Sequence, residues 1–271
     1  MASLIAKVGF GTVGLTRQPT ETTAIRLLEV AYDQGITHFD TAPAYGSGYS
    51  ERLVGKFLRK RSGITIATKF GLGPSSRGLL SPSLAVPLNF YRKKLLGSFY
   101  RPALTDSKAP SCRQITRKHI ETAVDSSRKA LGVDYIDYYL LHEGLPSLLE
   151  DSALDYLLEL KRRGIVGKLG LAANGSNYQT GHEFLNWDIL QYEYGPAWPG
   201  NASLPSKFPT MRHFFHSILK NYRAFSRPGV SVEDLPGHIL RTCIEKNPNG
   251  YVLFFSGNPE HIRNNLRVVS S

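Results

Sequence analysis

Short apolar runs alternate along the chain with longer segments in which apolar residues recur every three or four positions. In the first cycle, the run Val8–Thr12 is followed by a segment with helical spacing that opens at Pro19 and ends at Gly35, and the run Ile36–Asp40 comes next. Strands followed in this way by helices are typical of α/β proteins with a parallel sheet. We therefore predict a parallel α/β fold.

Eight runs of this kind can be placed along the chain. The predicted strands are Val8–Thr12, Ile36–Asp40, Ile64–Phe70, Asp134–His142, Ile165–Ala172, Ile189–Tyr194, Arg212–Leu219 and Tyr251–Ser256. Helices are predicted at about Ser50–Arg61, capped by Ser50–Glu51, and at about Ile120–Leu131 and Leu148–Arg163, and more weakly near His182. The run Arg212–Leu219 also fits a buried helix, because a short apolar run does not distinguish the two. Eight strands alternating with helices over roughly 250 residues indicate a (β/α)8 TIM barrel, here a single domain over residues 1–271.

Composition narrows the class of protein further. Of the 271 residues, 41% are hydrophobic and 11% aromatic, which argues against disorder and collagen-like repeats. No run reaches the roughly 18 apolar residues of a membrane span, and Met1–Lys7 lacks the apolar region of a signal peptide. The two cysteines, Cys112 and Cys243, form no C-x-x-C pair, so no disulfide framework or cysteine zinc site is expected. We expect a cytoplasmic protein without membrane association.

Three glycines in the first strand region match a dinucleotide-binding pattern. Gly9, Gly11 and Gly14 have the G-x-G-x-x-G spacing, and the acidic Asp40 ends the next strand. In that motif the helix begins within the glycines, so that its N-terminus meets the pyrophosphate. Here Leu15–Pro19 separates the last glycine from the helix. The spacing therefore favours a glycine turn over a Rossmann-type site.

Four polar residues fall at the C-terminal ends of successive predicted strands. Asp40 ends the second strand with Tyr45 just beyond it, Lys69 lies at the end of the third, and His142 ends the fourth. In a barrel these ends share one rim, where such folds carry their chemistry. Taken singly, Asp40 could cap a turn, Lys69 and Tyr45 could be solvated, and His142 could be a core histidine. Their joint placement favours a site, and Lys69 would repel a metal ion from the pair Asp40 and His142.

An acid, a phenol, an ammonium and an imidazole together suit carbonyl reduction. A free tyrosine, with a pKa of about 10, is a weak proton donor at neutral pH. A lysine beside the phenol is expected to lower that pKa, and a carboxylate holds the lysine charged. We therefore assign Tyr45 as the general acid/base, Lys69 as its tuner, Asp40 as the anchor of Lys69 and His142 as the group that orients the carbonyl.

These residues resemble the aldo-keto reductase family. The segment Phe39–Gly55, FDTAPAYGSGYSERLVG, is similar to the family's first signature, Thr68–Lys69 to its lysine strand and Tyr135–His142 to its histidine strand. The residues of the first signature are closer to those of the bacterial and plant sugar and pyridoxal reductase branches than to those of the mammalian aldose reductase branch. The resemblance implies an oxidoreductase acting on CH–OH donors and small carbonyl substrates, with NADP(H) favoured as cofactor and NAD(H) as the alternative. It also implies that the tetrad falls on Asp40, Tyr45, Lys69 and His142.

The resemblance carries over to the cofactor positions less uniformly. The implied cofactor-binding residues are Gln191, Asn174, His216, Ser256, Gly257, Asn258, Arg263 and Asn265. Gln191 matches the residue that holds the nicotinamide carboxamide, whereas Asn174 is one place late and an expected serine before it is absent. His216 stands where a stacking tyrosine is usual. Phe255 and His261 replace a frequent lysine and arginine, which weakens the expected clamp on a 2′-phosphate.

The net charge of +11 is concentrated in one stretch of sequence. Nine basic residues and one acid, Asp106, lie between Arg77 and Lys118. They belong to a long connection after the third strand, residues 71–117, whose aromatic and aliphatic content favours a packed lid over a disordered segment. We expect this lid to favour an anionic substrate, with a solvated basic surface as the alternative.

Two other classes of function stay open on the sequence. A barrel of this family can bind the nicotinamide cofactor as a regulatory or scaffold subunit without physiological turnover. Nucleic-acid binding through the basic stretch is disfavoured, because the stretch lacks regularly interleaved glycines and aromatics.

Overall fold

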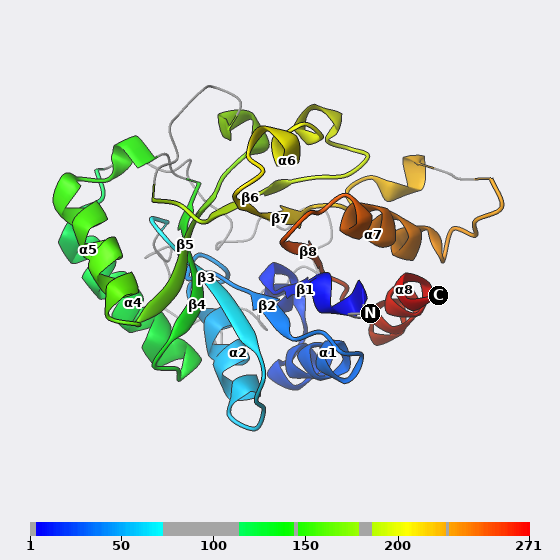
Figure 1. The fold of residues 1–271 in the computed structure, drawn as a ribbon. Helices are drawn as coiled ribbons and strands as arrows, with labels where there is room; N and C mark the ends of the chain where they lie inside the picture. Colours follow the sequence, from blue (N-terminus) through cyan, green and yellow to red (C-terminus); the bar gives the residue numbers. More distant parts are fainter. Residues whose placement is uncertain (1–3, 73–113, 144–145, 179–185, 226–227) are drawn as a thin grey trace, which may run out of the picture.

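The computed structural model describes residues 4–72, 114–143, 146–178, 186–225 and 228–271. Within them, eight parallel strands close into a barrel in sequence order, because β1 pairs with both β2 and β8 (Figure 1). The strands are β1 (Val8–Gly11), β2 (His38–Asp40), β3 (Thr65–Phe70), β4 (Ile136–His142), β5 (Val166–Ala172), β6 (Ile189–Glu193), β7 (Arg212–His216) and β8 (Tyr251–Phe254). The predicted (β/α)8 barrel is thus confirmed, and the run at Arg212 forms a strand.

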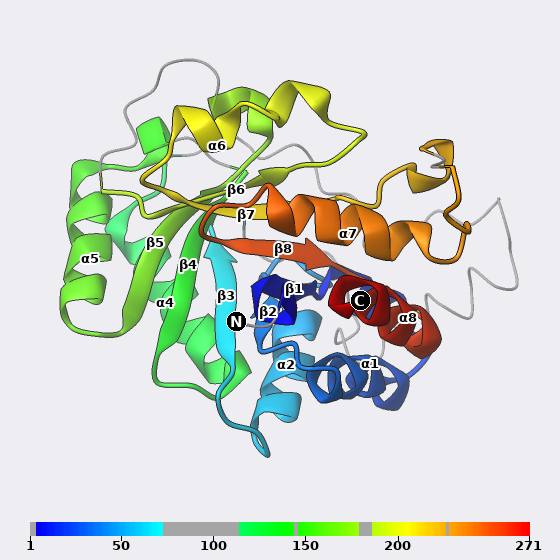
Figure 2. The same cartoon turned by 45° about the vertical axis from the view of Figure 1, so that its right-hand side comes forward.

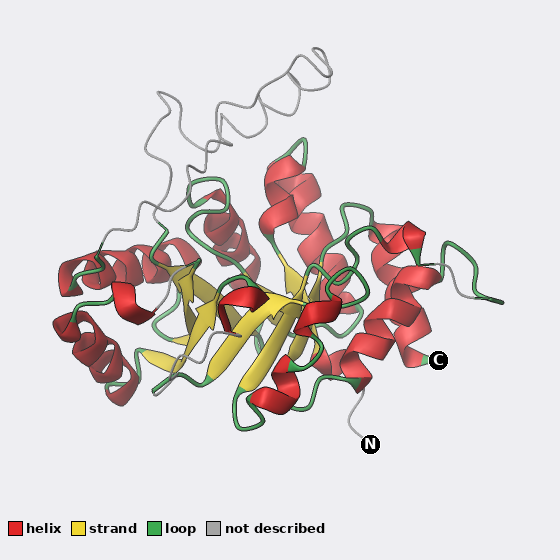
Figure 3. Cartoon of the chain, turned by 90° about the horizontal axis from the view of Figure 1, so that it is seen from above, coloured by secondary structure: helices red, strands yellow, loops and turns green. Residues whose placement is uncertain are grey.

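The helices lie outside the ring of strands (Figures 2 and 3). The α-helices are α1 (Glu21–Asp33), α2 (Tyr49–Leu58), α4 (Arg117–Leu131), α5 (Asp151–Arg162), α6 (Leu204–Lys207), α7 (Leu235–Glu245) and α8 (Pro259–Ser270). Short 3₁₀ helices are η1 (Leu4–Lys7), η2 (Val13–Arg17), η4 (Pro146–Leu148), η5 (Gly175–Tyr178), η6 (Pro199–Asn201) and η7 (Tyr222–Ala224). The last helix, α8, packs against both α1 and α7 and so completes the outer layer.

Local sequence signals explain where several helices begin and end. Thr20 and Thr116 cap α1 and α4 through reciprocal hydrogen bonds with the residue three positions later. Gly132 ends α4 in the left-handed conformation, with φ 68°. Helix α2 begins at Tyr49 after the left-handed Gly48, and the Ser50 side chain makes no cap. The expectation that Ser50 and Glu51 cap α2 is therefore wrong, because both side chains are buried beneath the helix.

The main core fills the space between the strands and the surrounding helices, and a smaller cluster fills the barrel itself. The interior cluster comprises Ala67, Tyr138, Leu140, Ala172, Ile189 and Phe214. His38 lies beside it, fully buried, and its ring stacks on Tyr251 with ring centroids 3.9 Å apart. These side chains pack the barrel interior and leave polar chemistry to the C-terminal strand ends.

The glycines of the dinucleotide-like pattern serve packing. A Cβ at Gly9 would lie 2.4 Å from the Leu253 side chain, and one at Gly14 would lie 2.1 Å from the Phe255 ring. The 3₁₀ helix η2, rather than an α-helix, follows β1. The Rossmann-type interpretation is therefore excluded in favour of a tightly packed turn.

Two predictions fall on segments outside the described residues. They are the weak helix near His182 and most of the lid-like segment 71–117. In the described part of the chain, no helix combines the length and apolar character that crossing a membrane requires.

Candidate active site

The four residues assigned from the sequence meet at one rim of the barrel. Asp40 ends β2, Tyr45 lies in the loop before α2, Lys69 is the penultimate residue of β3 and His142 ends β4. The closed parallel ladder holds these C-terminal strand ends at the same edge. Side chains separated by up to 102 positions in the sequence are thereby brought together.

Lys69 is the centre of the arrangement. Its ammonium donates to Asp40 Oδ1 at 2.7 Å, to the Thr41 carbonyl at 2.9 Å and to the Tyr45 hydroxyl at 3.2 Å. The side chain of Lys69 is only 2% exposed and that of Asp40 only 4%. An ammonium has three protons to donate, so these three acceptors satisfy it completely. The Lys69 charge is therefore fixed in position beside the phenol.

The protonation states of Lys69 and Tyr45 follow from their burial and from the charges of the pair Asp40–Lys69. Burial by itself lowers the pKa of Lys69, but the charge of Asp40 and the hydrogen bonds to Asp40 and Tyr45 outweigh it, so that the pKa is raised and the ammonium stays charged. Burial raises the pKa of Tyr45, and the Lys69 charge only partly opposes this effect. The pKa of Tyr45 is therefore raised, whereas the sequence led us to expect a lowered pKa. The difference arises because burial removes the phenol from water, an effect that outweighs the Lys69 charge. Tyr45 is thus a protonated phenol at neutral pH.

His142 contacts Tyr45 edge to face, with ring centroids 5.8 Å apart and an angle of 84° between the rings. Burial, and secondarily the charge of Lys69, lowers the pKa of His142 to about 3. The imidazole is therefore neutral over the physiological range and carries one N–H donor and one acceptor. Its Nδ1 is buried without a hydrogen-bond partner in the part of the chain that the structure describes. A polar group left in this state is available to an incoming polar molecule.

Gln191 connects the end of β6 to Asp40. It lies in β6, and its Nε2 donates to Asp40 Oδ2 at 3.0 Å, so both oxygens of that carboxylate are engaged. Gln191 is 3% exposed, and its Oε1 is buried with no partner among the described residues. This acceptor can receive an amide N–H, as a carboxamide would provide.

His216 ends β7 and faces the same rim. Its Nδ1 lies 2.9 Å from the Ser217 hydroxyl, and burial followed by the Lys69 charge lowers its pKa to about 4. Repulsion between the protonated forms of His216 and His142 also makes a small contribution to lowering the pKa of His142. His216 thus presents a neutral ring beside the tetrad.

The remaining predicted cofactor residues lie further out. Asn174 is exposed beyond the end of β5. Ser256, Gly257 and Asn258 form the turn before α8, where the Asn258 side chain caps the helix by accepting from the Glu260 N–H at 2.9 Å.

Two further residues of this group lie within α8. Arg263 is ion-paired with Glu260, whereas Asn265 is buried and 4% exposed. The structure therefore gathers Gln191 and His216 at the tetrad and places the others in α8 or just before it, with Asn174 apart.

A network of buried hydroxyls lies beneath the tetrad and was missed from the sequence. Thr12 and Ser50 are 2.6 Å apart through their hydroxyl oxygens, and the Thr41 hydroxyl donates to that of Ser50 at 2.9 Å. Thr12 also donates to the Asp40 carbonyl at 2.9 Å, and the Ser50 N–H donates to the Tyr45 carbonyl at 3.2 Å. All three hydroxyl residues are 0% exposed. Ser50 sits next to a predicted helix start, and that capping signal concealed its inward role.

Two carboxylates at the rim were also missed. Glu143 follows His142 with a left-handed backbone, φ 53°, and Glu193 ends β6 and accepts from the Gly175 N–H at 3.1 Å. Partial burial raises the pKa of Glu143, and the neighbouring charge of Glu193 raises it further. A non-glycine residue in this conformation next to His142 is a strained position of the kind found at functional sites.

Comparisons with known proteins identify the family to which this chain is similar. The family model described as Aldo/keto reductase family matches residues 7–206. A Glycine max protein named Probable aldo-keto reductase 1 is 32% identical over 197 residues, which cover 70% of this chain and 48% of that protein. The chain therefore spans about half the length of such curated relatives.

Solved structures share the fold at lower identity. The aldo-keto reductase AKR11C1 of Bacillus halodurans, in its holo form, superposes with a TM-score of 0.69 at 19% identity, covering 98% of this chain and 87% of that one. An aldo-keto reductase of Klebsiella pneumoniae in complex with NADPH gives a TM-score of 0.64 at 15% identity, covering 98% and 86%.

Proposed function

Because the chain belongs to the aldo/keto reductase family, we propose that it is an NADP(H)-dependent oxidoreductase that interconverts an aldehyde or ketone with the corresponding alcohol. The observation that carries the proposal is the buried Lys69 ammonium, which touches Asp40 on one side and the Tyr45 hydroxyl on the other. That arrangement holds a proton donor next to a fixed positive charge, as carbonyl reduction requires.

In reduction, the Tyr45 O–H donates its proton to the substrate oxygen. The phenolate left behind is stabilised by the Lys69 ammonium at 3.2 Å, and Asp40 keeps that ammonium in place at 2.7 Å. The neutral His142 imidazole donates an N–H to the same substrate oxygen and orients it. In oxidation of the alcohol, the Tyr45 phenolate takes the proton back. A bound nicotinamide cofactor supplies or accepts the hydride at the carbonyl carbon.

The rim has groups that fit such a cofactor. With a nicotinamide bound, the unpartnered Gln191 Oε1 would accept from its carboxamide and the neutral ring of His216 would stack on it. Ser256, Gly257 and Asn258, with Arg263, lie at the N-terminus of α8, where backbone N–H groups favour phosphate.

The choice between the two nicotinamide dinucleotides depends on the same helix. The NADPH seen in the Klebsiella pneumoniae structure supports NADP(H) here, with NAD(H) as the alternative. Asn265 and the exposed Asn174 complete the proposed contacts. Arg263 must leave Glu260 to reach a 2′-phosphate, which weakens the preference for NADP(H).

The regulatory or scaffold barrel remains the second candidate. It is favoured by the alanines at 172 and 173, where the family has a serine, and by His216 in place of a tyrosine. The hydrogen bonds of Lys69 favour turnover instead, because they hold its charge beside the Tyr45 hydroxyl, as a catalytic proton donor requires.

Replacing Tyr45 with phenylalanine tests the proposal directly. The Tyr45→Phe variant should lose at least about a hundredfold in kcat/KM on an aldehyde panel, the scale of a lost general acid. NADPH binding, followed by fluorescence titration, should stay within about twofold of the wild type, because the hydroxyl contacts Lys69 and the cofactor is held elsewhere. Turnover that survives the substitution would contradict the mechanism. NADPH binding without turnover in the wild type would favour the regulatory barrel.

For the substrate, we propose a small carbonyl compound or alcohol with a preference for anionic molecules. The support is the basic stretch Arg77–Lys118, which follows the strand that carries Lys69. Changing Arg92, Lys93 and Lys94 to glutamine should lower kcat/KM for a carboxylated aldehyde about fivefold or more, relative to its uncharged analogue. An unchanged ratio of the two kcat/KM values would reject the anionic preference.

A further inference from the structure

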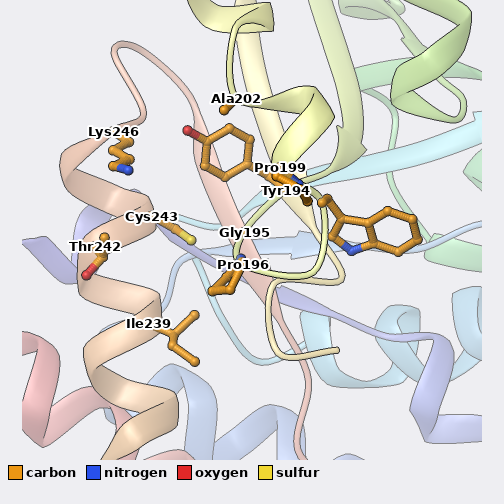
Figure 4. Close-up of a pocket in the computed structure, with 10 residues that line it drawn as sticks. Tyr194, Gly195, Pro196, Pro199, Ala202, Ile239, Thr242, Cys243 and Lys246 are labelled. Carbon is orange, nitrogen blue, oxygen red and sulfur yellow. The ribbon is translucent and has the colours of Figure 1, made fainter. Parts of the chain in front are cut away.

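A pocket of about 290 Å³ lies on the side of the barrel, between α7 and the chain that follows β6. Its walls include Tyr194, Pro196 and Trp198 from that chain, and Ile239, Cys243 and Lys246 from α7. Figure 4 shows Ile239 and Cys243 of α7 projecting toward Gly195 and Pro196. The residues assigned to catalysis and cofactor binding do not belong to its lining.

The pocket exists because the chain after β6 covers this flank thinly. Where α5 has 12 residues, the segment between β6 and β7 forms only η6, with 3 residues, and α6, with 4. Gly195 has φ 114°, and a Cβ there would lie 3.2 Å from the Ile218 carbonyl oxygen, so the position excludes a side chain that could fill the space. The gap between this loop and α7 therefore stays open.

The walls are apolar and preformed. Tyr194 is 6% exposed and stacks on Phe215, with ring centroids 3.8 Å apart, which fixes its orientation. Ile239 and Cys243 are 2% and 3% exposed. A cavity of about 150 Å³ with such walls is large enough for a benzene ring. A pocket of about 290 Å³ thus has room for a ring with a short side chain.

One charged group at this pocket has no partner in the described structure. Lys246 is exposed and forms no ion pair in that part of the chain. An ammonium beside apolar walls is complementary to a carboxylate on an apolar body.

We propose that this pocket binds a small aromatic carboxylate, with its ring against Tyr194, Ile239 and Cys243 and its carboxylate toward Lys246. The site is separate from the tetrad but joined to it through the backbone, since the Tyr194 N–H donates to the His216 carbonyl at 3.0 Å. The proposal does not rest on the proposed function, because binding can be measured without turnover.

The buried thiol of Cys243 provides the main readout. In a Cys112→Ser background, Cys243 is the one thiol of the chain, and its labelling by N-ethylmaleimide can be followed by mass spectrometry. We expect 3-phenylpropanoate to slow labelling at least fivefold at saturation, and the uncharged 3-phenylpropanol to require a higher concentration for the same effect. Should Cys243 resist labelling without ligand, Trp198 fluorescence in a Trp187→Phe variant decides, since these are the two tryptophans.

Three variants separate the pocket from other modes of binding. Lys246→Met should raise the half-protecting concentration of 3-phenylpropanoate about fivefold and leave that of the alcohol unchanged. Lys118→Met, which removes an exposed lysine of α4, should change neither value. Ala202→Phe should block the pocket and abolish protection by both compounds.

Two outcomes would overturn the proposal. The first is the absence of both protection and fluorescence change at millimolar acid. The second is equal half-protecting concentrations of acid and alcohol in the wild type, which would show that the Lys246 ammonium does not select a carboxylate.

Discussion

At the scale of single residues, Lys69 shows how burial and charge must be balanced together. Its ammonium is nearly inaccessible to water, and three acceptors replace the lost hydration. The Asp40 carboxylate depends on Lys69 equally, because among the described residues the partner of its other oxygen is the neutral Gln191 amide. A buried ion pair of this kind contributes little net stability when intact, yet breaking it leaves an uncompensated charge.

The variant Lys69→Met is accordingly expected to destabilise the fold as well as abolish activity. Removal of the ammonium leaves the Asp40 carboxylate buried and unpaired, which costs about 3–5 kcal/mol in the free energy of unfolding. The double variant Asp40→Asn/Lys69→Met should recover part of that loss, because the remaining amide is neutral. Urea denaturation of the wild type and both variants measures the difference. A single variant as stable as the wild type would show that the pair is solvated in solution.

At the scale of elements, the strands and most helices could be predicted from the sequence, because each buries a face with a regular period. The limits of β4 and β5 came within two residues of the prediction for that reason. The short α6 and the turn of η6 were not predicted, since Pro199 and Pro205 interrupt the pattern that marks a helix. Ser50 was misassigned for a related reason, because a hydroxyl near a helix start has the same local pattern whether it caps the helix or faces inward.

The hydroxyl network of Thr12, Thr41 and Ser50 connects β1, β2 and α2, and thereby fixes the loop that carries Tyr45. Ser50→Ala removes the shared partner of two buried hydroxyls and should cost about 1–3 kcal/mol in the free energy of unfolding. It should also lower kcat on aldehydes more than it raises KM, because the position of Tyr45 becomes less defined.

The exposed Ser126 in the middle of α4 provides the matched control. Ser126→Ala should stay within about 0.5 kcal/mol of the wild type in urea denaturation. Equal stability of the two alanine variants would mean that the hydroxyl network makes no net contribution.

At the scale of the whole molecule, the sequence alone locates the excess of positive charge but does not identify what that charge binds. The basic residues gather between Arg77 and Lys118, whereas the described rim carries Glu143 and Glu193 beside the histidines. The convergence of Asp40, Tyr45, Lys69 and His142 could be predicted because they lie at or just beyond the C-terminal ends of successive strands. The rim carboxylates could not, because their approach depends on the left-handed turn at Glu143 and on the closure of the barrel.

Acid sensitivity follows from the histidines that the fold keeps neutral. Burial lowers the pKa of His38 to about 3, well below the ordinary value of 6.5, and does the same to a similar degree for His142 and His216. Between pH 6.5 and about pH 3, these histidines bind protons in the unfolded chain but not in the native chain. The free energy of unfolding is therefore fully retained above pH 6.5 and falls as the pH decreases toward 3, by up to about 1.4 kcal/mol per pH unit for each such histidine.

His38 is the position at which this effect can be isolated, because it is completely buried and its ring packs in the barrel interior against Tyr251. His38→Phe keeps a ring on Tyr251 but cannot titrate. The difference in the free energy of unfolding between this variant and the wild type, from urea denaturation at pH 4.5 to 8, should be constant above pH 6.5. Below it the difference should shift in favour of the variant by about 1.4 kcal/mol per pH unit. Tyr251→Phe, in the same aromatic cluster, should give a difference that does not vary with pH. A flat difference for His38→Phe as well would mean that this histidine titrates in the native protein as it does in the unfolded chain.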